Sequence, residues 1–318
     1  MHRKIRVLVI VGSTGSGKTD LGISLARQYA GVIIAADSRT VYRGMDVGTA
    51  KPAADMDAAV PRTRSFRLVH GIPHYGLDIR NPDESYSAAE FVHDAERHIR
   101  RIARQGKLPI VVGGTGLYVE AVVGGLDFPD VPPDPALRAM LAQRSLKELG
   151  AWYARLDPVG WERIDRANPR RLIRALEVSL ATGRPFSELR RRRPTAFDVL
   201  QIGVDRSPRA LERRIAMRAR AMLRGGLISE TQVLLTRYGD VEPLRGMGYR
   251  EVVAWLQQPL DRRASLRVLA RAIARSMERY ARKQRAWFRR DLTVHWVRFP
   301  RQAERLVRVF LVSSGGGQ

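Results

Sequence analysis

The chain has 318 residues, 44% of them hydrophobic and 28% charged, which suits a globular protein with one large core and a second lobe. It has no cysteine, which excludes disulfide bridges, thiolate metal sites and cysteine nucleophiles and is compatible with a reducing cytoplasm. Lys and Arg number 56 against 32 Asp and Glu, a formal net charge of +24, so nucleic acid is the leading large partner unless an arginine-rich genome explains the excess.

The first apolar run, Ile5–Val11, is short and β-branched and leads straight into a glycine-rich loop. It lacks the small-residue cleavage site of a signal peptide, so we interpret it as a buried strand. A helical pattern follows from Thr19 to Tyr29, which completes a strand–loop–helix unit. No apolar stretch approaches the roughly 20 residues of a membrane helix, so we expect a soluble, cytoplasmic protein without a membrane partner.

The loop between this strand and helix fits the pattern G-x-x-x-x-G-K-[ST] at every fixed position. Glycines let the backbone approach phosphate oxygens, Lys18 neutralises their charge, and the Thr19 hydroxyl can bind Mg²⁺, the cofactor that we expect. The predicted phosphate contacts are Gly12, Ser13, Thr14, Gly15, Ser16, Gly17, Lys18 and Thr19. The pattern indicates phosphate binding and leaves kinases, nucleotide hydrolases and other transferases open.

Two further predicted strands end at polar residues. Val32–Ala36 is followed by Asp37, and Leu108–Val112 by the loop that contains Thr115. Strands alternating with helices predict an α/β fold, a P-loop NTPase-like parallel sheet flanked by helices. Ligands bind beyond the carboxyl ends of such strands, so both side chains are expected near the phosphate loop. From its position alone, Asp37 can bind magnesium, cap the following turn or act as a base.

Strand signals then stop until Phe197–Val204. The intervening residues have helical patterns, including Pro169–Thr182 with Gly183 as its C-cap. The sequence therefore predicts a helical insertion domain over 122–196, between two parts of a P-loop catalytic core, 1–121 and 197–318.

The second part of the core is predicted to hold two helices and a strand. One helix begins at Ser207-Pro208, a longer one covers about 261–290, and Val294–Val297 is a final strand. The Ser-Ser-Gly-Gly-Gly-Gln tail, 313–318, is expected to be disordered.

Basic residues recur every four positions along the predicted long helix, opposite an apolar set. They are Arg263, Arg267, Arg271, Arg275, Arg279 and Lys283, and the apolar set is Leu266, Leu269, Ile273, Met277 and Tyr280. A solvated face is the common interpretation of such a stripe. Only Glu278 offsets the basic residues between 262 and 290, however, and this unpaired like charge favours contact with phosphates.

The block Asp37-Ser-Arg-Thr-Val-Tyr-Arg-Gly-Met-Asp-Val-Gly-Thr-Ala-Lys-Pro52 resembles the signature of bacterial tRNA dimethylallyltransferases. The match covers nearly the whole chain and continues through Pro73-His74-Tyr75, Leu77-Asp78-Ile79, Gly113 to Tyr118, Arg170 to Val178, Gly183, Gln284 and Trp287 to Arg289. Two positions depart from the family pattern. Thr40 stands where Gln or Leu is expected, which bears on a tRNA contact, and Tyr75 replaces a frequent second His.

The resemblance implies transfer of the dimethylallyl group of dimethylallyl diphosphate to the exocyclic N6 amine of the adenine 3′-adjacent to the anticodon in tRNA, with release of diphosphate. It implies that Asp37 accepts the amine proton, that Thr115 holds the amine and that Lys18 acts on the leaving group. Arg214 and Arg218 correspond to positions near the diphosphate. A monomer is expected.

The tRNA contacts that the resemblance implies fall in both predicted domains. They are Asp37, Ser38, Arg39, Thr40, Thr115, Arg138, Arg170, Arg171, Leu172, Ile173, Arg174, Arg245, Tyr249, Arg250, Arg282, Lys283, Gln284, Arg285, Trp287 and Arg289. Tyr249 equally fits a core position. We expect the insertion and the basic helix to hold the anticodon stem-loop from two sides while the target adenine leaves its stack.

Two other functions also need the phosphate loop. One is a small-molecule kinase that uses ATP, and the other is a non-catalytic, nucleotide-regulated RNA-binding protein. Under either of these functions, Asp37 would have a role other than that of a base for the adenine amine. The six histidines do not suggest a metal site, because His70 and His74, four residues apart, are separated by Pro73, which argues against a shared helix.

Overall fold

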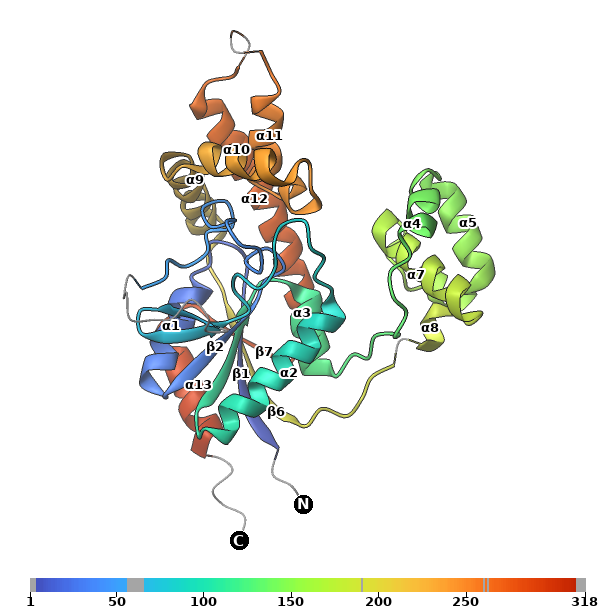
Figure 1. Cartoon of the computed structure of the whole chain (residues 1–318). Coiled ribbons are helices and arrows are strands. Elements are labelled where there is room, and N and C mark those ends of the chain that lie inside the picture. Colours follow the sequence, from blue (N-terminus) through green and yellow to red (C-terminus); the bar gives the residue numbers. More distant parts are fainter. Residues whose placement is uncertain (1–3, 56–65, 190, 260, 262, 313–318) are drawn as a thin grey trace. The chain divides into compact units, whose positions relative to one another are not determined.

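The computed structural model describes residues 4–55, 66–189, 191–259, 261 and 263–312. The chain divides into two compact units, Met1–Val123 with Ala196–Gln318 and Gly124–Thr195 (Figure 1). The predicted disordered tail, 313–318, lies outside the described residues.

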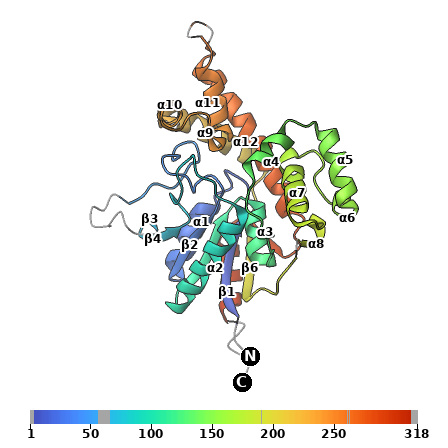
Figure 2. The same ribbon diagram turned by 45° about the vertical axis from the view of Figure 1, so that its right-hand side comes forward.

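A seven-stranded sheet in the order β3-β4-β2-β5-β1-β6-β7 forms the centre of the first unit (Figure 2). Its strands are β1 (Ile5–Val11), β2 (Gly31–Ala36), β3 (Arg67–Val69), β4 (Ile72–Tyr75), β5 (Leu108–Gly113), β6 (Phe197–Val204) and β7 (Val294–Val297). Neighbouring strands are parallel except for β3 with β4. The predicted sheet is confirmed, with an antiparallel edge pair that the sequence interpretation missed.

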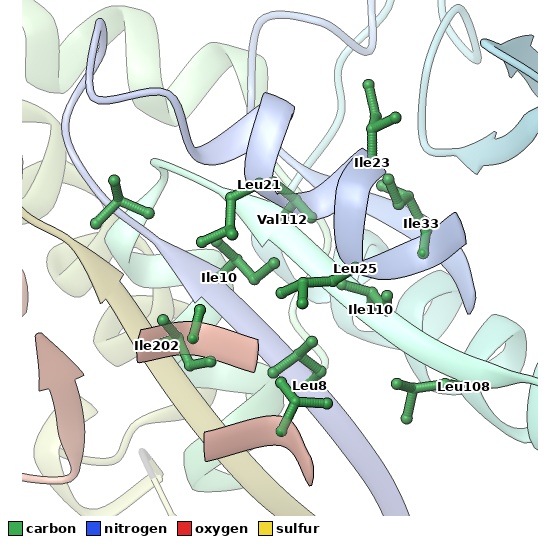
Figure 3. Close-up of a cluster of buried hydrophobic side chains, with 14 of the residues drawn as sticks. Leu8, Ile10, Leu21, Ile23, Leu25, Ile33, Leu108, Ile110, Val112 and Ile202 are labelled. Atoms are coloured by element: carbon green, nitrogen blue, oxygen red, sulfur yellow. The ribbon is translucent and has the colours of Figure 1, made fainter. Parts of the chain in front are cut away.

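Helices bury both faces of β1, which explains its continuous apolar sequence. On one face, α1 (Lys18–Gln28) and α13 (Pro300–Val312) belong to the same core as Leu8 and Ile10, and Figure 3 shows Leu21 and Leu25 against these side chains. Helix α2 (Ala88–Arg104) also packs against β1, β2 and β5. Its first turn is held by a capping box between Ser87 and Glu90. Helices thus cover the strands whose carboxyl ends carry the loops described below.

A second hydrophobic core of the first unit includes Met45, Leu227, Tyr249 and Ile273. The helices that form it are α9 (Pro208–Arg224), α10 (Leu227–Tyr238), the 3₁₀ turn η1 (Glu242–Arg245), α11 (Tyr249–Leu256) and α12 (Leu266–Phe288), while α3 (Gly116–Gly124) follows β5. Helix α12 packs against α9 and α11 and runs towards the sheet (Figure 1).

Helix α12 starts at Leu266, later than the predicted position near 261, with Ser265 as its N-cap. Arg263 therefore precedes the helix, and its guanidinium donates to the carbonyls of Leu256 and Gln258 and lies over the Trp255 ring. Its assignment to the basic stripe is wrong. Leu266 is also no part of the buried face, since it is 53% exposed.

The basic stripe of α12 is consequently Arg267, Arg271, Arg275, Arg279 and Lys283. All five side chains are exposed. The opposite side of the helix, with Leu269, Ile273 and Met277, is buried.

Helices also make up the second unit. They are α4 (Pro135–Ala142), α5 (Leu146–Leu156), α6 (Pro158–Trp161), α7 (Pro169–Thr182) and α8 (Phe186–Leu189). Leu141, Leu149, Tyr153 and Leu172 form their shared core. Gly183 ends α7 with a φ of 66°, so its predicted C-cap role is confirmed.

A buried carboxylate, Glu177, joins α4 to α7. Its two oxygens accept from Arg138 at 2.7 and 2.8 Å, one of them also accepts from Arg174 at 2.6 Å, and the other from the backbone N–H of Asp134 at 2.8 Å. Burial favours the neutral acid, but these donors prevail and hold the pKa of Glu177 below its ordinary value.

Glu177→Gln is expected to destabilise the second unit by about 3 kcal/mol at pH 7, because two guanidinium groups lose their shared anion. A lowered folded-state pKa means that this stabilisation is present above the unfolded pKa, near 4.3, and is lost as pH falls through the folded value. Hydrogen exchange of α7 amides measures it. Glu188→Gln is the matched control, since its pair with Arg184 is exposed. Equal exchange in both variants would contradict the assignment.

Candidate active site

A cavity of about 470 Å³ lies beyond the carboxyl ends of β2 and β5 in the first unit. The phosphate loop lines it with Thr14, Lys18 and Thr19, and Asp37 lines it from the end of β2. Parallel strands end at one edge of the sheet, which is why segments far apart in the sequence meet here.

The phosphate loop has the backbone that its glycines allow. Gly15 and Gly17 have φ of 81° and 95°, in the left-handed region that favours glycine. Helix α1 starts at Lys18 with Gly17 as N-cap, and no described side chain caps it, so its first N–H groups can serve a phosphate. Burial lowers the pKa of Lys18 to about 8, an effect that Asp37 opposes and Arg218 reinforces.

Three arginines that follow β6 hold the phosphate loop. Arg206 and Arg214 donate from Nε to the carbonyls of Ser16 and Gly15 at 3.0 and 2.7 Å, and Arg218 donates to the Thr14 hydroxyl at 3.2 Å. Arg214 and Arg218 therefore lie at the phosphate loop. Arg206 was not predicted, although it is the second residue after β6, the strand next to β1, a position from which the strand-end rule could have found it.

Asp37 and Thr115 lie on adjacent strand-end loops. One Asp37 oxygen accepts the Arg39 N–H at 2.9 Å, so the capping alternative is realised, and the carboxylate also faces the cavity. The Thr115 hydroxyl accepts the N–H of Ser38 at 3.0 Å. Tyr280, on α12, lines the cavity too, and burial together with the Asp37 charge raises its pKa to about 12. Tyr280 was assigned to the apolar face and missed as a site residue.

The side chains after Asp37 extend the cavity wall. Arg39 forms two hydrogen bonds to Glu242, at 2.9 and 3.3 Å, which outweigh burial and raise its pKa. The Thr40 hydroxyl is buried and has no hydrogen-bond partner among the described residues. Ser38 and Thr40 both line the cavity.

The predicted basic tRNA contacts differ in their surroundings. Lys283 is exposed and lines the cavity, as do Arg245 and Arg250, which pair with Asp240 and Glu251. Arg282 is exposed. Arg285 and Arg289 both pair with Asp205, at 3.5 and 3.1 Å, so an internal carboxylate already neutralises much of their charge.

Several residues predicted to contact tRNA have packing or ion-pairing roles in this structure. Tyr249 is 1% exposed and its hydroxyl donates to Glu230 at 2.6 Å, and Leu172 is fully buried. Ile173 packs partly buried against the same core as Leu172. Arg138 and Arg174 bind Glu177, whereas Arg170 and Arg171 are exposed on the first turn of α7.

The cavity wall offers oxygen donors that fit a magnesium ion. Thr19 brings a hydroxyl and Asp37 a carboxylate. Mg²⁺ is usually bound by one or two protein oxygens, with water and substrate phosphates completing its shell, so this small donor set suffices.

Two family models match the sequence. The model described as IPP transferase matches residues 40–291, and the one described as isopentenyl transferase matches residues 5–66. Among curated proteins, the tRNA dimethylallyltransferase of Synechocystis is 38% identical, over 91% of this chain and 90% of its own. Another, tRNA dimethylallyltransferase 1 of Trichlorobacter lovleyi, is 41% identical over 93% of this chain and 95% of its own.

Solved structures with the same fold include the tRNA isopentenylpyrophosphate transferase of Bacillus halodurans. It is 32% identical with a TM-score of 0.66, and the match covers 98% of this chain and 96% of that one. A eukaryotic dimethylallyltransferase acting on tRNA has a TM-score of 0.75 at 23% identity, over 98% and 81% of the two chains, and supports the fold alone. No helix in the described part of this chain is long and apolar enough to cross a bilayer.

Proposed function

The chain belongs to the IPP transferase family, and from this membership we propose that it is a tRNA dimethylallyltransferase. It transfers the dimethylallyl group of dimethylallyl diphosphate to the exocyclic N6 amine of the adenine 3′-adjacent to the anticodon. The observation that carries the proposal is one cavity lined by both a phosphate loop and the Asp37 carboxylate.

The phosphate loop holds the leaving diphosphate. As the bond between the allylic carbon and the diphosphate oxygen breaks, its electron pair and charge pass to the leaving group. Lys18 and the N–H groups at the start of α1 stabilise that charge, and the guanidinium of Arg218, which also lines the cavity, stabilises it further. Thr19 would hold the magnesium ion, which when bound neutralises further phosphate charge.

The adenine amine enters beside Asp37 and Thr115. Its lone pair is delocalised into the ring, so it is a weak nucleophile that needs a base to accept its proton as the new N–C bond forms. The free side of the Asp37 carboxylate is suited to that role, because the Arg39 N–H occupies one oxygen and fixes its orientation. Thr115 then positions the amine.

The basic stripe of α12 provides the tRNA surface. Its last two members, Arg279 and Lys283, also line the cavity, so a phosphate backbone along the stripe would bring its nucleotide to the site. The exposed Arg170 and Arg171 of the second unit are proposed as further tRNA contacts. We propose a monomer, and tRNA as the acceptor makes the cytoplasm the proposed place of action.

The test offers dimethylallyl diphosphate and an unmodified tRNA to the protein and measures diphosphate release. Release that needs both substrates supports the proposal. ATP consumption without dimethylallyl diphosphate would instead support the small-molecule kinase, which shares the phosphate loop.

Replacing Arg271 and Arg275 by Ala is expected to raise the KM for tRNA about tenfold and leave kcat unchanged, because these side chains hold phosphates away from the reacting atoms. The dependence of kcat/KM on salt concentration should flatten by about one power of that concentration for each arginine replaced. Arg305 and Arg308 of α13 are equally exposed, and their double Ala variant is the control. If the KM for tRNA rose equally in both double variants, the arginines of the stripe would act only through the overall positive charge of the protein and not through a specific tRNA contact.

A further inference from the structure

Gln284 joins two loops of the active site from the buried side of α12. Its side-chain oxygen accepts the N–H of Thr14 at 2.8 Å, and its side-chain nitrogen donates to the carbonyl of Gly114 at 2.8 Å. The residue is only 5% exposed. One amide thus connects the phosphate loop after β1 to the loop after β5, the loop that carries Thr115.

The loop after β5 is shaped to receive α12. A Cβ at Gly114 would lie 2.2 Å from the Gln284 side-chain nitrogen, and one at Gly116 would lie 2.4 Å from the Trp287 ring. Both distances are shorter than real Cβ contacts, so a side chain at either position would make the Gln284 amide or the Trp287 ring move from its present place. Thr115 lies between these glycines, so we expect its position to depend on how α12 packs against this loop.

Gln284 also determines which donors remain for the diphosphate. The Thr14 N–H donates to Gln284, while the Gly15 carbonyl and the Thr14 hydroxyl oxygen accept from Arg214 and Arg218, so of these groups only the Thr14 N–H is withdrawn as a donor. These contacts fix the backbone and the Thr14 side chain of the phosphate loop, and Gln284, Thr14 and Arg218 also line the cavity. The N–H groups at the start of α1 are then presented without rearrangement.

We propose that Gln284 is a positioning residue that fixes the phosphate loop relative to the Thr115 loop, so that the diphosphate and the amine are held in register. The sequence resemblance had suggested a tRNA contact for this residue. Its burial and its two backbone partners favour the positioning role. The proposal deepens the proposed function and rests on it for the identity of the two ligands.

The test compares Gln284→Met with Gln201→Met. Methionine keeps the length of the side chain and removes both hydrogen bonds. Gln201 is a matched control, since it is 4% exposed and its amide donates to Asp291 and Thr293, which do not line the cavity. Inorganic pyrophosphate binding, tRNA binding and steady-state transfer are measured for each protein, and thermal melting reports folding.

In Gln284→Met we expect pyrophosphate to bind about tenfold more weakly and kcat to fall about tenfold, with tRNA affinity within about twofold of wild type. Gln201→Met should leave all three values unchanged. Weakened tRNA binding with unchanged pyrophosphate binding would overturn the proposal in favour of a tRNA contact. An unchanged pyrophosphate affinity with only a lower melting temperature would overturn it in favour of simple packing.

Gly114→Ala provides a second variant that perturbs the same amide from the other loop. It should reproduce the loss in pyrophosphate affinity. The double variant with Gln284→Met and Gly114→Ala should bind pyrophosphate no more weakly than either single variant, because both substitutions act through the same amide. Additive losses would contradict the proposal. Pyrophosphate and tRNA binding need no transfer, so an inactive wild type would refute the proposed function while these measurements still decide the role of Gln284.

Discussion

Asp37→Asn is expected to lower kcat by roughly two to four orders of magnitude while tRNA binding stays within about twofold of wild type. Asparagine can still accept the Arg39 N–H, so the turn after β2 is retained and the loss reports the missing base. Single-turnover transfer at saturating tRNA and dimethylallyl diphosphate measures the effect.

Asp20→Asn is the control for Asp37→Asn. Asp20 also lines the cavity, but it is 83% exposed at its side chain and lies 4.0 Å from Arg214. Its variant should retain transfer within a few-fold. A wild-type transfer rate in Asp37→Asn would show that this carboxylate is not the base of the reaction.

Lys18→Met is expected to weaken pyrophosphate binding about a hundredfold and to lower kcat by at least as much, because the cation acts on a charge that grows as the diphosphate leaves. Calorimetric titration of the protein with pyrophosphate and magnesium measures the first effect, and steady-state transfer the second.

Lys283→Met distinguishes the two lysines that line the cavity. Lys283 belongs to the basic stripe, so its loss should raise the KM for tRNA and leave pyrophosphate affinity nearly unchanged. The role of Lys18 is contradicted if Lys18→Met binds pyrophosphate as tightly as wild type, or if the two lysine variants lose pyrophosphate affinity equally.

The parts of the site that lie in continuous motifs could be predicted from the sequence. The phosphate loop has a fixed spacing, and Asp37 follows a strand whose apolar run is unmistakable, so the strand-end rule brings the two together. Long elements such as β6 and α7 were found because their caps and periodicity extend over many residues.

Other features depend on contacts between distant parts of the chain. Gln284 meets Thr14 across 270 positions, and Arg138 meets Glu177 across 39, and no local pattern reports either pair. A family resemblance marks such residues as important without giving their contacts within the chain, which are Glu177 for Arg138 and Arg174 and Glu230 for Tyr249. The β3–β4 pair was missed because strands of three and four residues are too short for a recognisable alternation.

In the proposed reaction, one cavity holds the leaving diphosphate on the phosphate loop and the adenine amine at Asp37. This arrangement is tested most directly with two anticodon stem-loops, one with adenine 3′-adjacent to the anticodon and one with unsubstituted purine, which lacks the amine, at that position. We expect one dimethylallyl group on adenine N6 for each diphosphate released from the first stem-loop, and neither product nor diphosphate from the second. Equal diphosphate release from both stem-loops, or a dimethylallyl group on another atom, would contradict the account.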